Sequence, residues 1–220
     1  MMQRADVHAV GRRQARSAET RATILAAAEQ IFAKAGLDGA RTDDIATAAG
    51  VNKALLYYYF KSKDGLYTAV IDDQFREFNR QALAVLEAPE PAGTVLLRYV
   101  GLYFDFISAR RRYASLYQQL MTARGQPLDR LVRKHLVPRN TAFKKLLERG
   151  MRAGEFRRVD ARHTAMSVVS LIVFYFSAAP VLQALGHADA YDAASLGRRK
   201  REVLDFIRHG LFLDRESVSP

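Results

Sequence analysis

The sequence predicts an all-helical protein. Apolar residues recur at helical spacing along most of its 220 residues, and no stretch alternates polar and apolar residues as a strand does. Glycine and proline interrupt this pattern at intervals of about one helix. Hydrophobic residues are 49% and charged residues 26% of the chain, so we expect an ordinary globular protein of one or two domains with a sizeable core.

The chain is expected to begin with a flexible basic arm over residues 1–17, followed by a first helix over about 18–35. The helix has its apolar positions at helical spacing: Ile24, Leu25, Ala28, Ile31 and Phe32. Gly36 suits the left-handed residue that ends a helix. Two interpretations of the arm's arginines stay open, a solvated basic tail or a contact with a polyanion. They are Arg4, Arg12, Arg13 and Arg16.

A second, short helix is predicted over about Thr42–Ala49. Thr42 is a candidate N-cap. Asp43 and Asp44 follow in the first turn, where carboxylates suit the positive end of the helix dipole.

Gly50 permits a tight turn after this helix, and Asn52 can cap a third helix over about 53–59. Ser62 can cap a fourth helix that continues to about Leu86. Two short helices joined by a tight turn are the arrangement that lays one helix in the major groove of DNA.

Four consecutive aromatic residues, Tyr57 to Phe60, lie on the predicted third helix. Four neighbours cannot share one face when the period is 3.6 residues, so at least one must be exposed. The alternative is a hydrophobic core cluster. The net charge of +11 adds only weak support for DNA binding, because residues 1–65 account for no more than +3 of it.

Residues 88–93 form the clearest linker, Ala-Pro-Glu-Pro-Ala-Gly. Helical patterns follow near 94–109, 111–123, 128–153, 160–186 and 198–213, with breaks at 125–127 and at Gly154, Gly186 and Gly197. Residues 164–186 lack charge and are long enough to span a bilayer. Their serines and Pro180 instead favour a helix buried in an oligomer core.

Aromatic residues gather in the second half of the chain, and Tyr99, Tyr103 and Phe106 share one helical face. They are either packed core or the lining of an apolar cavity with tyrosine hydroxyls as polar handles. The candidate ligand-binding residues are Tyr99, Tyr103, Phe106, Tyr117, Met121, Phe143 and Tyr175.

Residues 110–158 carry fourteen Lys and Arg residues against three acidic ones, Asp129, Glu148 and Glu155. This segment is either a solvated face or a pocket or entrance that favours an anionic ligand.

Stripes on the last two helical patterns are candidates for a dimer interface. They consist of Val169, Val173, Phe176, Val203, Phe206, Ile207 and Gly210.

Several classes of function lack their sequence signals. The chain has no phosphate loop, nucleophile elbow or paired metal-ligand spacing, and its five histidines are scattered. It has no cysteine and no signal-peptide pattern. We therefore expect no catalytic residue, metal site or cofactor, and a cytoplasmic protein that is not an enzyme.

The N-terminal region resembles the TetR family of transcriptional regulators over about residues 18–70. The resemblance rests on three segments in order: Ile31-Phe-Ala-Lys-Ala-Gly36, Thr42 to Ala49, and Gly50-Val-Asn-Lys-Ala-Leu-Leu-Tyr-Tyr-Tyr-Phe-Lys-Ser-Lys-Asp-Gly-Leu66. Beyond residue 90 the likeness is only architectural.

The resemblance implies that the third helix is a recognition helix. Lys53, Ala54 and Leu55 would approach base edges or the groove floor. Thr42, Tyr57, Tyr58 and Lys63 would contact phosphates, and Tyr59 and Phe60 would pack inward.

The sequence departs from the family pattern at three positions. Arg41 stands where Ser or Thr usually caps the second helix, so the cap is expected to shift to Thr42 and Arg41 to meet a phosphate. Leu55 replaces a common Thr, and either touches a thymine methyl or simply packs. Tyr58 replaces a common His.

Together these observations predict three parts: an arm over 1–17, a helix-turn-helix DNA-binding domain over 18–65, and a ligand-binding and dimerisation domain over 66–215. We expect a homodimeric repressor that a small molecule releases from a palindromic operator, with no membrane partner. The alternative is a nonspecific, architectural DNA-binding protein. The sequence identifies neither effector nor operator, nor whether the effector induces or corepresses.

Overall fold

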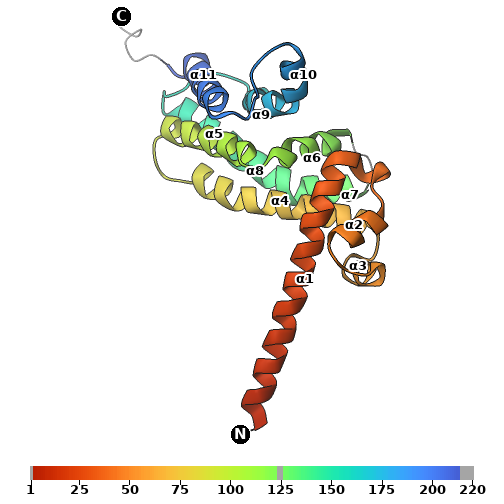
Figure 1. Ribbon diagram of the computed structural model, residues 1–220. Coiled ribbons are helices and arrows are strands. Elements are labelled where there is room, and N and C mark those ends of the chain that lie inside the picture. Colours follow the sequence, from red (N-terminus) through yellow and green to blue (C-terminus); the bar gives the residue numbers. More distant parts are fainter. Residues whose placement is uncertain (1, 123–125, 214–220) are drawn as a thin grey trace, which may run out of the picture. The chain divides into compact units, whose positions relative to one another are not determined.

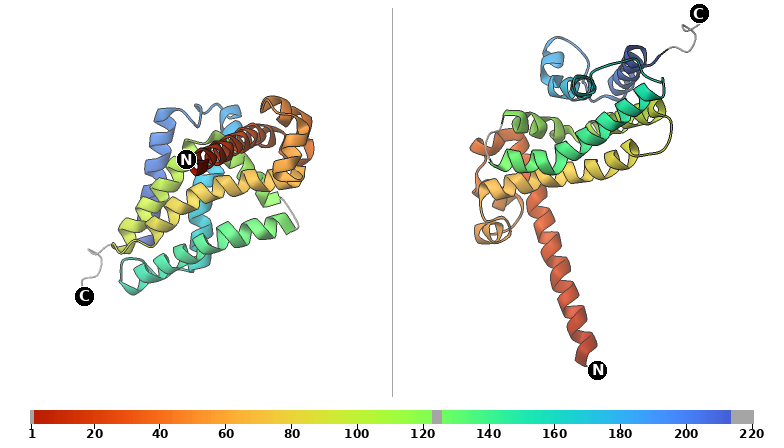
Figure 2. Two further views of the ribbon diagram at one scale, coloured as in Figure 1. Left: turned by 90° about the horizontal axis from the view of Figure 1, so that it is seen from below. Right: turned by 180° about the vertical axis from the view of Figure 1, so that it is seen from behind.

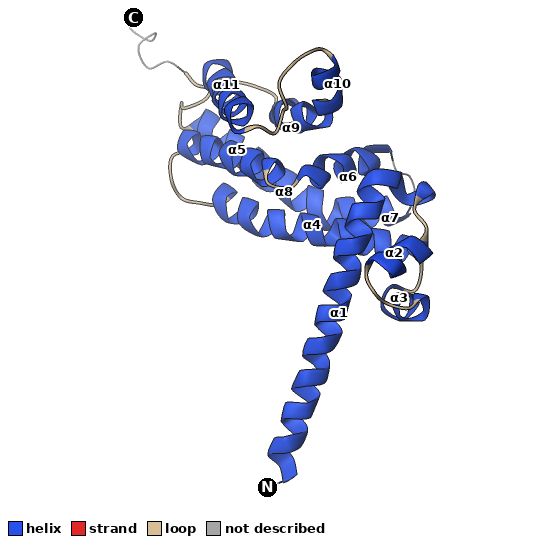
Figure 3. Ribbon diagram, in the orientation of Figure 1, coloured by secondary structure: helices blue, strands red, loops and turns tan. Residues whose placement is uncertain are grey.

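The structure is a computed structural model that describes the fold of residues 2–122 and 126–213, and the side chains of residues 14–120 and 129–213. Every regular element in these ranges is a helix, and the only strand-like pairing there is an isolated bridge between Phe156 and Phe212 (Figure 3). The all-helical prediction is therefore confirmed. The chain divides into two compact units, Met1–Asp73 and Gln74–Pro220.

The first unit contains three helices and the start of a fourth: α1 (Met2–Gly39), α2 (Thr42–Ala48), α3 (Lys53–Phe60) and α4 (Lys63–Leu86) (Figure 1). α2 packs against both α1 and α3. The apolar side chains that hold these helices together include Ile24, Phe32, Ile45, Leu56 and Leu66, all fully buried. Most of this core follows from helical periodicity alone.

The expected arm is helical in the structure, because α1 begins at Met2 rather than near residue 18. Its N-terminal part extends well beyond α2 and α3 of the same unit (Figure 2). Gly36 ends the regular part of α1 as predicted, with φ 71° and ψ −179°. That backbone conformation is open essentially only to glycine.

The predicted cap of α2 is wrong. Arg41 occupies the N-cap position, and its side chain makes no capping hydrogen bond. Thr42 is the first residue of the helix, and its side chain turns inward, with its Oγ1 3.5 Å from the Tyr57 hydroxyl. Asp43 and Asp44 in the first turn thus provide the negative charge that suits the positive end of the α2 dipole.

The other two predicted caps are confirmed. Asn52 Oδ1 accepts a hydrogen bond of 2.7 Å from the Leu55 amide at the start of α3. Ser62 Oγ accepts one of 2.9 Å from the Gly65 amide at the start of α4. Each cap satisfies an amide that would otherwise lack a partner, and so fixes where its helix begins.

The second unit is built from the rest of α4 and from the helices that follow: α5 (Ala92–Ser108), α6 (Arg111–Thr122), α7 (Gln126–Leu131), a π-helical turn η1 (Val132–Leu136), α8 (Val137–Arg152), α9 (Ala161–Ser177), α10 (Ala179–Ala184) and α11 (Ala193–Leu211). α5 lies at the centre of this unit and packs against α6, α8, α9 and α11 (Figures 1 and 2).

Glu155, in the loop after α8, holds the start of α5. Its two carboxylate oxygens accept hydrogen bonds of 3.0 and 2.7 Å from the amides of Ala92 and Gly93. Pro91 at the N-cap offers no side-chain acceptor, so this carboxylate takes over the capping role from a distant part of the sequence.

The last two helical patterns divide differently from the prediction. α9 ends at Ser177, and Pro180 lies in the first turn of α10, where proline is tolerated. α11 begins at Ala193, so Gly197 lies inside a helix instead of breaking one.

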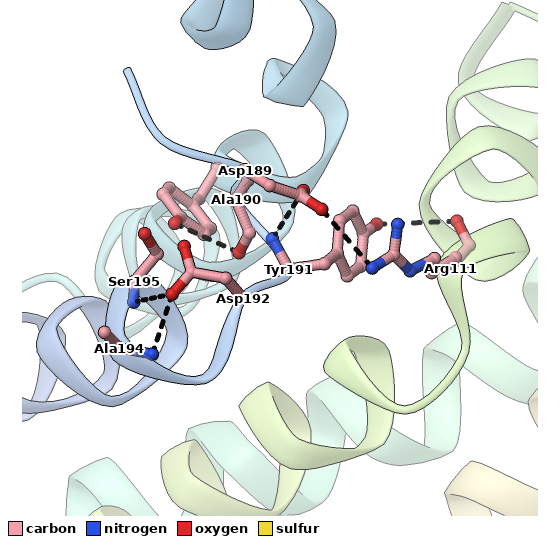
Figure 4. A network of polar contacts seen from close by, with 8 residues as sticks. Arg111, Asp189, Ala190, Tyr191, Asp192, Ala194 and Ser195 are labelled. Atoms are coloured by element: carbon pink, nitrogen blue, oxygen red, sulfur yellow. Dashed lines mark hydrogen bonds and ion pairs between the residues drawn. The ribbon is translucent and has the colours of Figure 1, made fainter.

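A polar network fixes the beginning of α11 (Figure 4). Asp192 accepts hydrogen bonds of 2.8 and 3.0 Å from the amides of Ala194 and Ser195. Arg111 stacks on the Tyr191 ring, with its Cζ 4.4 Å from the ring centre, and lies 3.5 Å from Asp189 Oδ2. These contacts anchor the loop before α11 to the start of α6.

No helix within the described residues is long and apolar enough to cross a bilayer.

Candidate nucleic-acid interface and effector site

α3 buries one face and exposes the other. Leu56 is fully buried and Phe60 is 6% exposed, whereas Tyr57 is 39% and Tyr58 69% exposed. Lys53 and Ala54 share the exposed side, and Leu55 is partly buried beside them. The helix therefore offers a surface with a cation, a small residue and two phenols, which are the groups that fit a major groove and its flanking phosphates.

Lys53 is tied to α2 by an ion pair. Its Nζ lies 2.9 Å from Asp43 Oδ1 on the first turn of α2. The hydrogen bond to Asp43 raises the pKa of Lys53, and both side chains are exposed. For Lys53 to contact DNA, its ion pair with Asp43 must open, or its ammonium group must bond Asp43 and DNA through different N–H donors.

Tyr57 and Thr42 meet at the junction of α2 and α3. The two hydroxyls are 3.5 Å apart, and Thr42 is only 9% exposed. Arg41 is exposed next to them. The structure thus brings three predicted phosphate contacts to one place, although Thr42 presents little surface of its own.

Lys63 has an intramolecular role. Its Nζ donates to the carbonyl oxygens of Asp38 and Ala40, at 3.3 and 3.2 Å. These bonds secure the loop between α1 and α2 against the start of α4, and they compete with the predicted phosphate contact.

α1 supports α3 from behind. The Tyr59 hydroxyl lies 3.0 Å from Ser17 Oγ, and the Arg21 guanidinium lies over the Phe60 ring, 5.4 Å from its centre. Phe60 is buried as expected, and Tyr59 is partly buried. Both residues of the predicted supporting pair thus face α1 rather than solvent.

In the second unit, four of the predicted ligand-binding residues form one aromatic cluster. Tyr99, Tyr103, Phe106 and Phe143 are all at most 4% exposed. Phe78 of α4 lies between them, with ring centres 4.4 Å from Tyr103 and 4.9 Å from Phe106. Tyr99 contacts Phe143 at 5.1 Å.

The three other predicted residues behave differently. Tyr117 lies at the edge of the cluster, partly exposed and 6.2 Å from Tyr113. Tyr175 does not belong to it: it packs with Phe104 and Phe176, and its hydroxyl donates to the Ala190 carbonyl at 3.2 Å. The side chain of Met121 lies outside the described residues.

The sequence did not single out three polar residues of this cluster, Arg139, His135 and Asn79, and Tyr113 stood only among the aromatic residues of the second half. Arg139 and His135 are each 3% exposed and Asn79 is 7% exposed. Arg139 belongs to the basic segment 110–158, but nothing in its local sequence separates it from the other Lys and Arg residues of that segment, which are all at least partly exposed where the structure describes them. The one available signal is its spacing of four residues from His135, which places both on one helical face.

The predicted dimer interface needs correction. Val173, Phe176, Val203 and Ile207 are at most 6% exposed, so they belong largely to the core of their own unit and offer little surface to a partner. The prediction took core-facing apolar residues on both helices for surface ones, because an amphipathic pattern does not say which stripe faces the core.

Exposed apolar residues lie on the same two helices. Phe206 is 66%, Phe174 71% and Met166 71% exposed. Phe206 also borders a groove of about 680 Å³, which is lined by Leu171, Arg199, Glu202, Val203, Asp205, Phe206, His209 and Gly210. This combination keeps α9 and α11 as the candidate surface for association.

A short helix presented to solvent after a tight turn, and held by two others, defines a helix-turn-helix DNA-binding protein. The family profile described as "Bacterial regulatory proteins, tetR family" matches residues 24–70. The profile described as "Tetracyclin repressor-like, C-terminal domain" matches residues 94–207, more than half of the chain. The chain belongs to the TetR family and is a DNA-binding transcriptional regulator.

Similar proteins include two named regulators. The chain is 29% identical to the HTH-type transcriptional repressor NicS of Pseudomonas putida, over 86% of this chain and 88% of that protein. It is 27% identical to the HTH-type transcriptional regulator RutR of Escherichia coli strain K12, over 93% and 96%.

Solved structures share the fold. The transcriptional regulator FadR from Bacillus subtilis, in complex with stearoyl-CoA, superposes with a TM-score of 0.69 at 19% identity, over 86% of this chain and 97% of that one. The ketosteroid transcriptional regulator KstR2 of Mycobacterium tuberculosis gives 0.72 at 16% identity, over 88% and 95%.

Proposed function

We propose that the protein is a cytoplasmic repressor that binds a palindromic operator as a homodimer and leaves it when a small molecule binds the helical domain, residues 66–215. The observation that carries this proposal is the exposed face of α3, where Lys53, Ala54, Tyr57 and Tyr58 lie together over a buried, capped scaffold. Arg41 adds a cation at the adjacent start of α2. We assign base contacts to Lys53 and Ala54, and phosphate contacts to the others.

Two copies are needed for specificity. One recognition helix reads only a few base pairs, and two half-sites roughly multiply the discrimination. Exposed Phe206, Phe174 and Met166 on α9 and α11 support association through these helices, because large exposed apolar side chains favour burial against a partner. A self-complementary surface of this kind gives a two-fold dimer, which matches a palindromic site.

Release follows from a shift between two dimer states. DNA binding requires the two recognition helices to lie one groove turn apart, about 34–36 Å. A small molecule that binds more tightly to dimers with another spacing lowers operator affinity, and a coupling of about 1–3 kcal/mol is enough. α4 supports this mechanism because it is one continuous helix from Lys63 to Leu86 that joins the DNA-binding part to the rest.

The relatives favour repression and a small-molecule effector. NicS is described as a repressor, and the FadR structure holds stearoyl-CoA. Both descriptions support the class of mechanism, in which a small molecule controls a DNA-binding repressor.

The direct experiment selects genomic DNA fragments with purified full-length protein at physiological salt. We expect a single palindromic motif among the bound fragments. The matched variant Tyr57→Phe should still select it with lower yield, since only a phosphate contact is lost, whereas Lys53→Ala should lose most enrichment. Broad recovery of unrelated sequences by the wild-type protein would contradict the proposal and would favour an architectural role.

A further inference from the structure

One cation of the basic segment 110–158 is buried. Arg139 is 3% exposed, while the other Lys and Arg side chains described in that segment reach solvent at least in part. A charge is rarely buried without an ionic partner, because removing it from water costs several kcal/mol. Arg139 therefore needs an explanation that its solvated neighbours do not.

The partners of Arg139 are neutral. Its Nη1 donates to Asn79 Oδ1 at 3.2 Å. Its guanidinium carbon lies 5.0 Å from the centre of the Phe78 ring and 5.5 Å from that of Tyr103. Within the part of the chain that the structure describes, no carboxylate forms an ion pair with it. A guanidinium carries five N–H donors, so one bond to Asn79 leaves it with donors for a further partner.

Two tyrosine hydroxyls share this environment. Tyr103 is fully buried and Tyr113 is 3% exposed, and among the described residues neither hydroxyl makes a hydrogen bond of ordinary geometry. The Tyr113 hydroxyl neighbours both the Tyr103 hydroxyl and the Arg139 guanidinium, and burial raises its pKa by more than these two neighbours lower it. Buried polar atoms without partners are uncommon in native proteins and call for a ligand or another specific cause.

The site is also held rigidly. His135 is the second-to-last residue of the π-helical turn. Its ring stacks on Phe75, with ring centres 5.7 Å apart. Asn79 Nδ2 donates to the His135 carbonyl at 2.9 Å while its Oδ1 receives Arg139. π-helical turns often occur at functional sites, and this one sets the register in which His135 and Arg139 both point inward.

We infer that Arg139, with the hydroxyls of Tyr103 and Tyr113, binds the carboxylate of a small organic monoacid that has an apolar body. The inference rests on the proposed function, since this acid would be the effector of the repressor. A guanidinium grips a carboxylate with two parallel hydrogen bonds, and the hydroxyls supply further donors.

The surroundings select a single negative charge and an apolar remainder. One cation with neutral donors balances a carboxylate, whereas a phosphate of nearly two charges would remain partly uncompensated in a buried site. The rings of Phe75, Phe78 and Phe106 pack against Tyr103 and Tyr113 in the same cluster, and such rings suit contact with an apolar ring or short chain.

The test uses matched acid and amide probes: benzoate with benzamide, and hexanoate with hexanamide. Full-length protein is titrated by calorimetry and followed by thermal unfolding. We expect at least one acid to bind and raise Tm, and its amide to do neither. Binding should be lost in Arg139→Met and kept in Lys145→Ala, which removes an exposed cation from the same helix.

A folding defect in Arg139→Met would also abolish binding, so two tyrosine variants provide a second test. Tyr103→Phe and Tyr113→Phe remove groups that have no described partner, so both should fold, and each should weaken acid binding about tenfold. The inference is overturned if no acid binds, if acids and amides bind alike, or if acid binding survives both the arginine and the tyrosine substitutions.

Operator selection with the same protein separates the two claims. A palindromic motif without acid binding would overturn this inference and leave the proposed function intact. Acid binding without any selected motif would contradict the proposed function and leave the carboxylate site at Arg139 supported.

Discussion

At the scale of single residues, the aromatic cluster of the second unit combines large apolar rings with polar groups that lack partners. Burial raises the pKa of Tyr103 and Tyr99 and raises that of Tyr113 to about 12. These phenols therefore remain neutral hydrogen-bond donors at physiological pH. The effect of each buried hydroxyl on the free energy of unfolding should be measurable with single Tyr→Phe substitutions.

Tyr113→Phe should leave the free energy of unfolding at pH 7 unchanged or raise it slightly, because the hydroxyl that it removes is buried and has no described partner. The matched control is Tyr175→Phe, which deletes a hydroxyl bonded to the Ala190 carbonyl at 3.2 Å and should cost about 1 kcal/mol. Urea unfolding measures both. A loss in Tyr113→Phe as large as that in the control would contradict this account.

The same residue predicts a pH dependence. Its pKa is about 12 in the folded protein against 10.0 for an ordinary tyrosine. Above pH 10 the unfolded chain loses this proton while the folded protein keeps it, so stability falls as pH rises from 10 to 12. The full loss is about 3 kcal/mol. Tyr113→Phe should show a shallower decline in alkaline urea titrations; identical declines in the two proteins would refute the assignment.

Lys53 provides the residue-scale test of recognition. Lys53→Ala should weaken operator binding at least tenfold, the discrimination typical of one specific contact, and should weaken binding to random DNA much less. Its stability should barely change, because its ion pair with Asp43 is exposed. Fluorescence anisotropy with both DNAs measures this, with Lys34→Ala as an exposed-lysine control. Equal losses on both DNAs would assign Lys53 to nonspecific phosphate contact.

At the scale of helices, the junction between α3 and α4 fixes the pose of the recognition helix. Lys61 adopts a positive φ of 65° there, and the Ser62 hydroxyl caps α4. Gly65 lies so close to the Phe60 carbonyl oxygen that a Cβ atom would clash with backbone. A side chain at this position must therefore move one helix against the other.

Gly65→Ala should destabilise the protein by about 1–3 kcal/mol through this overlap, and operator affinity should fall with it. Gly197→Ala, inside α11, meets only an arginine side-chain nitrogen at 3.6 Å and should instead add about 0.5–1 kcal/mol, since alanine favours helix. Thermal unfolding of the two variants gives the comparison. A stable, fully active Gly65→Ala protein would show that the junction is not rigid.

The proposed association surface lies on α9 and α11. Phe206→Glu places a charge on a side chain that is 66% exposed, and should convert dimer to monomer in sedimentation experiments while leaving the fold intact. Val137→Glu, at an exposed apolar position of α8, is the matched control and should stay dimeric. A dimeric Phe206→Glu protein would move the interface to another face.

At the scale of the whole molecule, sequence patterns predicted the helices and caps that depend on residues close together in the chain. Helical periodicity, Asn52 and Ser62 located the helix-turn-helix and its caps, because each effect acts over a few residues. They did not predict that Glu155 caps α5 across some sixty positions of sequence, or that Thr42 faces Tyr57 instead of capping α2.

The same limit explains the errors at the two candidate sites. Which stripe of α9 and α11 faces inward depends on what packs against it, so Val203 and Ile207 were assigned to the surface although they are buried. Arg139 resembles its solvated neighbours in sequence. Only tertiary packing, which brings Asn79, Phe78 and Tyr103 around it, distinguishes it from them.

The specificity ratio tests the central claim most directly. The dissociation constants of the full-length protein for its selected operator and for random DNA of equal length are measured at physiological salt. The account predicts at least about a thousandfold preference for the operator, as expected of a specific regulator, and a clear fall of that ratio in Lys53→Ala. A ratio near one, with equally steep salt dependence on both DNAs, would contradict it.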